Sequence, residues 1–192
     1  MRTLYLMRHS LTEANERRLY CGDTDLPLSE GGRVRAKARA EERPLPKCDL
    51  YVTSGMARAD ETLLLLAGRT PDAVIPELAE MRFGTFEMRG YEELKEDADY
   101  RRWIDDCMGA GTVRCPGGES QSGYRARILE GGAALLALEW ETALAVVHGG
   151  TIANLMGAWF PGAGKGFYDW QPKPCEGYAV RFDGAPREYE VL

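Results

Sequence analysis

The sequence has few histidines and no closely spaced pair of cysteines. It contains 2 His and 5 Cys in 192 residues, and the cysteines are scattered without a C-x-x-C pair. This spacing argues against a zinc site or a disulfide framework. We therefore expect no metal and no cofactor, and we expect free thiols in a reducing, cytoplasmic compartment. The cysteines are Cys21, Cys48, Cys107, Cys115 and Cys175.

Long apolar runs and an excess of positive charge are also missing. Runs such as Leu63 to Ala67 are far shorter than the roughly 20 apolar residues of a membrane span, and Arg8 and His9 interrupt the N-terminal apolar stretch before it resembles a signal peptide. Lys+Arg 24 against Asp+Glu 30 gives a net charge of −6. Nucleic-acid binding needs a basic patch instead. We expect no nucleic acid and no membrane as partners, and an anionic ligand must be held by a few arginines gathered locally.

Short apolar runs alternate with helix-like segments along the chain. Hydrophobic residues make up 44% and charged residues 28%, as in an ordinary globular domain. The alternation predicts an α/β fold, a three-layer α/β/α sandwich with a mostly parallel central sheet covered on both faces. The predicted strands are residues 3–7, 49–53, 73–75, 143–147, 178–182 and 188–192, and the predicted helices are residues 29–42, 57–67, 91–107, 122–141 and 151–160.

Both histidines directly follow predicted strands. His9 follows the first strand with Arg8 beside it, His148 follows the fourth, and Arg58 lies four residues after Ser54 at the end of the second. Ligands of open α/β sheets bind beyond the carboxyl ends of the strands, so we expect these side chains to converge. The guanidinium fork matches phosphate oxygens. The group therefore suits a phosphomonoester, although each residue alone also fits an ordinary strand-end histidine or a solvated arginine.

Six stretches resemble, in order, the motifs of the histidine phosphatase superfamily, the phosphoglycerate mutase-like proteins. The resemblance runs from about residue 3 to about residue 155, and six weak motifs in one register are specific together. It implies a phosphoglycerate mutase-like fold in a single domain, residues 1–192, with a loop and helix insertion at about 81–141 that partly covers the site. The six stretches are residues 4–15, 22–32, 54–62, 77–87, 116–120 and 146–152.

The resemblance also implies the roles of the candidate catalytic residues. His9 attacks phosphorus and forms a phosphohistidine, while Arg8, Arg58 and His148 bind the phosphoryl oxygens. Glu80 protonates the leaving alkoxide and then takes a proton from the attacking water. Only the resemblance selects Glu80 over the neighbouring Glu77 and Glu87. Further phosphate or substrate contacts are expected from Asn15, Cys21, Gly22 and Gly149, although Cys21 also fits a small buried residue.

Two positions depart from the family pattern beside the nucleophile. Ser10 stands where the family has Gly, and Leu11 where Glu or Gln is common. Ser10 is expected to narrow the pocket or to add a hydroxyl group, so the departures affect substrate choice rather than bond making. Glu119 and Arg127 fit either an ion pair under a loop or substrate contacts. The loops at residues 109–123 and 161–177, with Arg114, Lys165 and Lys173, are expected to decide the substrate.

The implied function is hydrolysis of a small phosphorylated metabolite by a phosphomonoesterase, a histidine acid-base phosphatase, through a phosphohistidine. Phosphoglycerate mutase-type phosphoryl transfer is the alternative within the family, but such mutases are usually longer than 192 residues. A phosphohistidine-protein phosphatase and an α-ribazole-phosphate phosphatase are narrower options. From another class, the chain would be a non-catalytic phosphate-binding protein. The sequence makes no prediction of the oligomeric state.

Overall fold

The computed structural model describes residues 1–107 and 109–192 and contains a six-stranded mixed sheet in the order β3-β2-β4-β1-β5-β6. Strands β1 to β4 pair in parallel, and β5 and β6 are antiparallel additions at one edge. All six predicted strands are present, which confirms the mostly parallel α/β fold. They are β1 (Arg2–Arg8), β2 (Leu50–Thr53), β3 (Ala73–Val74), β4 (Thr142–Val147), β5 (Gly177–Asp183) and β6 (Ala185–Val191).

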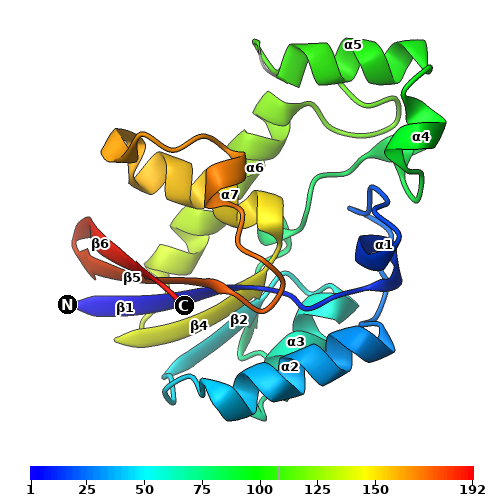
Figure 1. The fold of residues 1–192 in the computed structure, drawn as a ribbon. Helices are drawn as coiled ribbons and strands as arrows, with labels where there is room; N and C mark the ends of the chain where they lie inside the picture. Colours follow the sequence, from blue (N-terminus) through cyan, green and yellow to red (C-terminus); the bar gives the residue numbers. More distant parts are fainter. Residues whose placement is uncertain (108) are drawn as a thin grey trace.

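Helices cover both faces of this sheet and make the predicted three layers. Helices α2 (Glu30–Glu42) and α3 (Ala57–Ala67) lie on one face, and α6 (Gln121–Ala137) and α7 (Gly149–Trp159) on the other (Figure 1). The last five residues of β4 are fully buried. A strand without polar alternation is typical of a parallel sheet covered on both sides.

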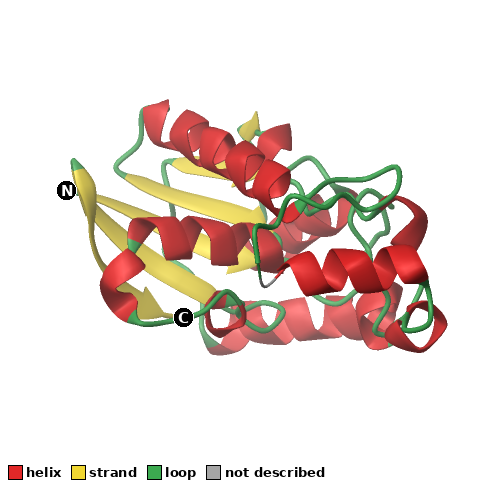
Figure 2. Ribbon diagram, turned by 90° about the horizontal axis from the view of Figure 1, so that it is seen from above, coloured by secondary structure: helices red, strands yellow, loops and turns green. Residues whose placement is uncertain are grey.

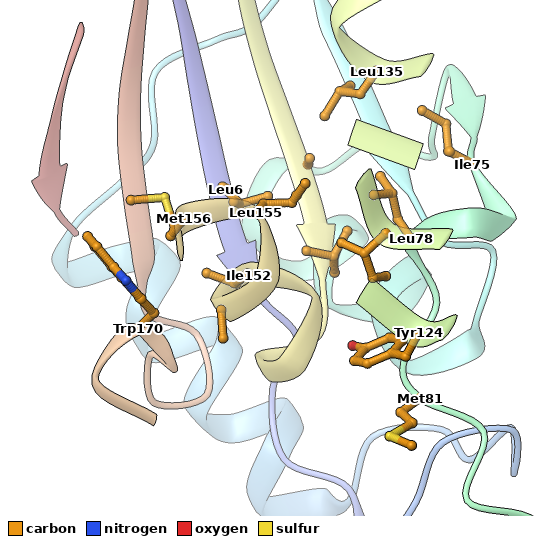
Figure 3. Close-up of a cluster of buried hydrophobic side chains, with 14 of the residues drawn as sticks. Leu6, Ile75, Leu78, Met81, Tyr124, Leu135, Ile152, Leu155, Met156 and Trp170 are labelled. Atoms are coloured by element: carbon orange, nitrogen blue, oxygen red, sulfur yellow. The ribbon is translucent and has the colours of Figure 1, made fainter. Parts of the chain in front are cut away.

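Two buried clusters hold the layers together. The larger one fills the space between the sheet and helices α6 and α7 and includes Leu6, Leu135, Ile152 and Leu155 (Figure 3). The smaller cluster, with Met7 and Leu63 among its members, packs α3 against the opposite face. No helix among the described residues is long and apolar enough to cross a membrane.

The carboxyl ends of the parallel strands meet at one edge of the sheet. In the register of the sheet Arg8 is paired with Val147, and Thr53 with Val146. The residues that follow these strands must therefore come together. The short helices α1 (Glu13–Glu16) and α4 (Tyr91–Leu94) and helix α5 (Ala98–Cys107) lie beyond the same edge (Figures 1 and 2).

The single helix predicted over residues 91–107 is wrong, because the structure breaks it into α4 and α5. The side chain of Asp97 accepts hydrogen bonds from the backbone N–H groups of Asp99, at 2.9 Å, and of Tyr100, at 3.2 Å. An aspartate in this position caps the start of a new helix. The helical spacing of apolar residues continues across the break between α4 and α5, so the sequence pattern gave no sign of it.

The helix predicted over residues 122–141 ends early, at Ala137. Leu138 has an extended backbone, and the indole N–H of Trp140 donates to the Leu135 carbonyl at 3.0 Å, satisfying an acceptor at the helix end. Leu129 faces outward on this helix and is 36% exposed. The buried positions instead follow the helical spacing from Tyr124; they are Tyr124, Ile128, Gly131, Gly132 and Leu135.

Short elements complete the chain between the layers. Helix α1 was missed because it has only 4 residues, and Thr12 and Asn15 form a capping box at its start. In the described ranges, four 3-10 helices lie in the connections; they are η1 (Pro76–Leu78), η2 (Gly84–Phe86), η3 (Pro161–Ala163) and η4 (Tyr168–Trp170).

Candidate active site

A cavity of about 320 Å³ lies beyond the carboxyl edge of the sheet. Five of the predicted site residues line it, although they come from three separate stretches of the sequence. These are Arg8, His9, Asn15, Cys21 and Glu80. The other lining residues are Leu19, Tyr20, Met81, Phe83, Trp103, Ile104, Cys107, Gln121, Tyr124, Gly150, Phe167, Tyr168 and Gln171.

His9 is held as a neutral imidazole with a free lone pair. Its Nδ1 lies 2.6 Å from the carbonyl oxygen of Ser10. A carbonyl oxygen only accepts, so Nδ1 carries the proton and Nε2 keeps its lone pair. Burial, followed by the positive charges of Arg58 and Arg8, lowers the pKa of His9 to about 3. The ring is therefore uncharged at neutral pH, with a lone pair on Nε2, which is the state that a nucleophile requires.

His148 and Arg58 lie behind His9 rather than on the cavity wall. The imidazole rings of His9 and His148 are 5.1 Å apart between centroids, at an interplanar angle of 63°. His148 is fully buried and Arg58 is only 1% exposed. Neither side chain lines the cavity in this conformation. They therefore influence a ligand there through their effect on His9, and they contact it directly only after a local rearrangement.

The guanidinium of Arg58 is tied to the loop of residues 22–24. Its two terminal nitrogens donate to the carbonyls of Gly22, at 2.8 Å, and Thr24, at 3.0 Å. The carboxylate of Glu87 holds the same loop by accepting from the backbone N–H groups of Gly22 and Asp23. Glu87 is thus committed to a structural anchor, which leaves Glu80 as the carboxylate at the cavity.

Gly22 supports this arrangement through its missing side chain. A Cβ atom there would lie 1.6 Å from the carbonyl oxygen of Met81, so only glycine permits the contact between the loop and the residue after Glu80. Gly22 does not line the cavity. Its position in the fold is that of a packing residue.

Arg8 places a buried cationic group at the cavity with an unused donor. One terminal nitrogen donates to the Pro172 carbonyl at 2.9 Å, while the buried Nε has no hydrogen-bond partner among the described residues. The guanidinium lies against Gly149, where an added Cβ would be 3.1 Å from its Cζ atom. A buried donor without an acceptor is costly, so this N–H is suited to a ligand oxygen.

Both carboxylate oxygens of Glu80 accept hydrogen bonds. Oε1 accepts from the hydroxyl of Tyr124, at 2.5 Å, and from the backbone N–H of Met81, at 3.0 Å. Oε2 accepts from the backbone N–H of Gly150, at 3.1 Å. We expected the backbone N–H of Gly149 to donate to phosphate. In the structure the backbone N–H of the next residue, Gly150, donates to Glu80.

Glu119 and Arg127 form an ion pair, which was one of the two roles predicted for them; the other was contact with the substrate. Arg127 donates to Glu119 at 2.7 and 2.8 Å, and its remaining N–H groups bind the carbonyls of Glu77, Ala79 and Glu80. These contacts clamp the chain that carries Glu80. Burial opposes the charge of Glu119, but the hydrogen bonds and charges of Arg127 and Arg82 prevail and lower its pKa.

Asn15 and Cys21 contribute polar groups to the wall. The side-chain oxygen of Asn15 accepts from the Thr12 backbone at 3.0 Å, which directs its amide nitrogen away from that contact. The thiol of Cys21 donates to the Thr24 carbonyl at 3.4 Å. Burial raises the pKa of Cys21, so the group is a neutral thiol at neutral pH.

The expectation that Ser10 narrows the pocket or adds a hydroxyl to it is wrong. Ser10 is fully buried, and its hydroxyl donates to the Gly32 carbonyl at 2.7 Å. Its backbone N–H donates to Thr62 at 2.9 Å. The side chain therefore packs behind the nucleophile. Leu11 also does not line the cavity.

The basic residues of the two long loops do not line the cavity either. Arg114 donates to the Gly118 carbonyl, and the ammonium group of Lys165 lies 4.3 Å from the ring centroid of Trp170. These loops instead contribute uncharged lining residues, which are Gln121, Phe167, Tyr168 and Gln171. In the part of the chain that the structure describes, no group of three or more His, Cys, Asp or Glu side chains is arranged to hold a metal ion.

Three residues of the site were missed by the sequence analysis. Ser54 Oγ lies 2.8 Å from Nε2 of His148, Tyr124 bonds Glu80, and Gly150 donates to Glu80. Ser54 and Gly150 stood inside recognised motifs, but the motifs alone do not show which partner each group meets. Tyr124 carried no signal, because an aromatic residue at helical spacing is typical of a core position.

Comparison with known proteins agrees with this fold. Residues 4–192 match the profile of the Histidine phosphatase superfamily (branch 1). The chain is 40% identical over 111 residues to the adenosylcobalamin/alpha-ribazole phosphatase of Salmonella typhimurium, a match that covers 56% of this chain and 55% of that protein. The aligned chain thus spans only about half the length of the curated relatives it matches first.

Solved structures match over a greater length. The crystal structure of a putative alpha-ribazole-5'-P phosphatase from Escherichia coli superimposes with a TM-score of 0.88 at 26% identity, covering 100% of this chain and 95% of that one.

Another relative found by sequence is a 2,3-bisphosphoglycerate-dependent phosphoglycerate mutase of Methylobacterium radiotolerans, which is 34% identical over 67% of this chain and 63% of its own length. The protein is thus an α/β protein with two buried, neighbouring histidines at the carboxyl edge of its sheet. It belongs to the histidine phosphatase superfamily, branch 1.

Proposed function

We propose that this protein is a phosphomonoesterase that forms a phosphohistidine at His9 and hydrolyses the phosphate ester of an uncharged, ring-bearing alcohol. The observation that carries the proposal is the composition of the cavity wall. Among the described residues that line it, Arg8 and Glu80 alone carry a formal charge, and most of the remainder are aromatic or aliphatic. We further propose that residues 1–192 act as one domain, in which helices and loops of about residues 81–141 partly cover the site.

The first half of the reaction uses the lone pair of His9. Nε2 attacks phosphorus, the P–N bond forms, and the bond from phosphorus to the ester oxygen breaks. The Ser10 carbonyl accepts the Nδ1–H, at 2.6 Å, and stabilises the positive charge that the ring acquires. Glu80 gives its proton to the departing alkoxide, because an alkoxide is a poor leaving group without one.

The second half reverses the role of Glu80. The carboxylate accepts a proton from water as the water oxygen attacks phosphorus, and the P–N bond breaks to regenerate neutral His9 with release of phosphate. Glu80 is then protonated again for the next turnover. One carboxyl group therefore serves as acid and as base in turn.

The charge of the phosphoryl group is met by arginine and histidine side chains. A phosphomonoester carries about −1.5 to −2 charges. The unpartnered Nε–H of Arg8 and the amide of Asn15 are donors at the cavity for the phosphoryl oxygens. Arg58 contributes its charge from behind His9, and it reaches a phosphoryl oxygen when the bound anion replaces the Gly22 and Thr24 carbonyls. His148 and the backbone of Gly149 complete the site, with Cys21 beside it.

The outer wall favours a flat apolar group over a charged one. Tyr20, Phe83 and Trp103 form a packed aromatic cluster, with ring centroids 5.0 to 6.1 Å apart, and Phe167 lines the cavity with them. Aromatic side chains stack well on aromatic rings. A ribotide that carries an aromatic base, such as the alpha-ribazole phosphate named for the relatives, has the required shape.

The alternative within the family is phosphoryl transfer of the mutase type, as in the relative from Methylobacterium radiotolerans. Phosphoglycerate has a carboxylate besides its phosphate. With Arg8 and Arg58 engaged by the phosphoryl group, no further basic side chain among the described lining residues is left for the carboxylate, which disfavours this substrate. A binding protein without catalysis would not require a neutral His9 in the same cavity as Glu80.

A phosphate-release assay tests the proposal. The purified protein is incubated with alpha-ribazole 5'-phosphate, 3-phosphoglycerate and phosphoserine, each with and without EDTA. We expect the largest kcat/KM for the ribotide, no dependence on added bisphosphate, and no loss in EDTA. Preference for either charged acid would overturn the assigned substrate class. Turnover by His9→Ala would overturn the phosphohistidine route.

A further inference from the structure

Tyr124 belongs to no motif of the family resemblance, yet it makes the shortest contact of the catalytic carboxyl group. Its ring is buried, at the end of the large apolar cluster next to Met81 (Figure 3). Its hydroxyl lies 2.5 Å from Oε1 of Glu80. A residue serving only the core would need no hydroxyl group at this depth, because burying one requires a partner.

The hydrogen of the Tyr124 hydroxyl has one direction. A carboxylate only accepts, so the hydroxyl must donate to Glu80. The other neighbour, Thr151, lies 3.3 Å away and has its own hydrogen committed to the Leu78 carbonyl at 3.0 Å. Burial, and then the charge of Glu80, raise the pKa of Tyr124 well above its usual value. The hydroxyl therefore stays protonated throughout turnover.

The two oxygens of Glu80 are consequently unequal. Oε1 accepts two hydrogens, from Tyr124 and from the Met81 backbone, and both of its lone pairs are occupied. From the part of the chain that the structure describes, Oε2 accepts only one, from the Gly150 backbone at 3.1 Å. One lone pair of Oε2 is left for a proton.

We propose that Tyr124 is a positioning residue that occupies Oε1 of Glu80, so that Oε2 alone carries the proton to the leaving group and later receives one from water. The proposal rests on the proposed function, in which Glu80 is the acid and base. Without the hydroxyl, Oε1 competes for the proton, and the carboxyl group loses the contact that fixes its rotation.

The Tyr124 ring and its hydroxyl group are closely packed by neighbouring residues. A Cβ at Gly150 would lie 2.8 Å from the Tyr124 hydroxyl oxygen. The guanidinium carbon of Arg127 lies 5.2 Å from the centroid of the Tyr124 ring. The ring is thus held between α7 and the clamp on the Glu80 chain, and the hydroxyl points to the one acceptor that the reaction uses.

A pair of substrates separates this role from a structural one. Benzyl phosphate and 4-nitrophenyl phosphate are of similar size, but the benzyl alkoxide needs a proton to leave and nitrophenolate does not. The measured quantity is the ratio of kcat/KM for benzyl phosphate to that for 4-nitrophenyl phosphate. In Tyr124→Phe we expect this ratio to fall about tenfold or more, as expected for the loss of a hydrogen bond to a charged group. Misfolding or general loosening would lower both rates and leave the ratio unchanged.

Two further variants keep the test decisive. Tyr124→Met also lacks the hydroxyl and fills the space flexibly, so it shows the same fall in the ratio if Tyr124→Phe does not fold. Tyr51→Phe is the matched control, because its buried hydroxyl accepts from the Cys48 backbone at 3.1 Å, far from Glu80, and its ratio stays that of the wild type. A folded Tyr124 variant with the wild-type ratio overturns the proposal.

Glu80→Gln distinguishes failure of this inference from failure of the proposed function. If Glu80→Gln lowers the ratio and the Tyr124 variants do not, Tyr124 has no positioning role and Glu80 remains the acid. If Glu80→Gln itself keeps the wild-type ratio, the assignment of Glu80 is wrong and the inference fails with it.

Discussion

The Nε–H of Arg58 donates to Nδ1 of His148 across 3.3 Å, between two side chains that are both buried. A guanidinium only donates, so Nδ1 is unprotonated and the proton of the neutral ring is on Nε2, 2.8 Å from Ser54. Burial, and then the charge of Arg58, lower the pKa of His148 well below its usual value. One arginine thus sets both the tautomer of His148 and part of the electrostatic environment of His9.

Replacing Arg58 changes the pH dependence of catalysis. Burial is the first cause of the low pKa of His9, and the charge of Arg58 is the second. Arg58→Met removes a positive charge, so protonation of His9 becomes easier and its pKa rises. We expect the acid limb of the kcat/KM profile to move to higher pH, with kcat/KM at pH 7 reduced about 100-fold. Arg181→Met, at an exposed pair on β5, is the control, and an unmoved acid limb in Arg58→Met would contradict the prediction.

The two histidines make the protein less stable as the pH falls. The unfolded chain protonates a histidine near pH 6.5, whereas folded His9 is protonated only near pH 3. Between these values the unfolded state binds more protons, so the free energy of unfolding falls with falling pH, by about 2 kcal/mol for His9 from pH 6.5 to pH 5. The pKa of folded His148 is also well below its usual value, so His148 acts in the same direction. Urea unfolding of His9→Gln and His148→Gln at pH 7, 6 and 5 measures this. Each variant should show a shallower decline than the wild type, and an identical decline would refute the assignment.

Gly150 leaves room for the carboxyl group of Glu80, the proposed acid and base. In Gly150→Ala the new Cβ would lie 2.5 Å from Oε1 of Glu80, so the carboxyl group must move. We expect kcat to fall about 100-fold, a large part of a general acid's contribution, with little change in KM. Gly157→Ala is the matched control in the same helix, since its Cβ meets nothing nearer than 3.8 Å. Equal activities of the two variants would show that Glu80 tolerates displacement.

The buried carboxylate of Glu119 stabilises the chain that carries Glu80. Glu119 is 5% exposed and bonds Arg127 at 2.7 Å and Arg82 at 3.0 Å. Glu119→Gln leaves the half-buried Arg127 without its counter-charge, and we expect a loss of about 3 kcal/mol in the free energy of unfolding. The pKa of Glu119 is lowered, so this contribution is present above the unfolded value and is lost as pH falls through the folded one. Urea titrations at pH 7 and pH 3.5 measure the difference between wild type and variant, which should shrink at the lower pH.

The sheet and the identity of the candidate nucleophile could be predicted from the sequence because the signals are local. Strand β4 is a continuous apolar run, and its residues after Thr142 are completely buried. His9 and His148 follow strands that pair in parallel, and parallel strands bring their carboxyl ends to one edge whatever the intervening chain does. Helix boundaries were less accurate, because Asp97 competes as a cap within a segment whose apolar spacing continues.

The sequence by itself determined the α/β fold, the family, and the residue types that gather at the carboxyl edge, because periodicity and motif order are properties of the chain. Only the tertiary structure decided which hydrogen-bond partner each group has. Ser10 faces Gly32 and Arg58 faces His148, and Tyr124 turns a core position into a contact with Glu80. The reason is geometric, since the direction of a donor depends on rotamers and packing between segments far apart in sequence.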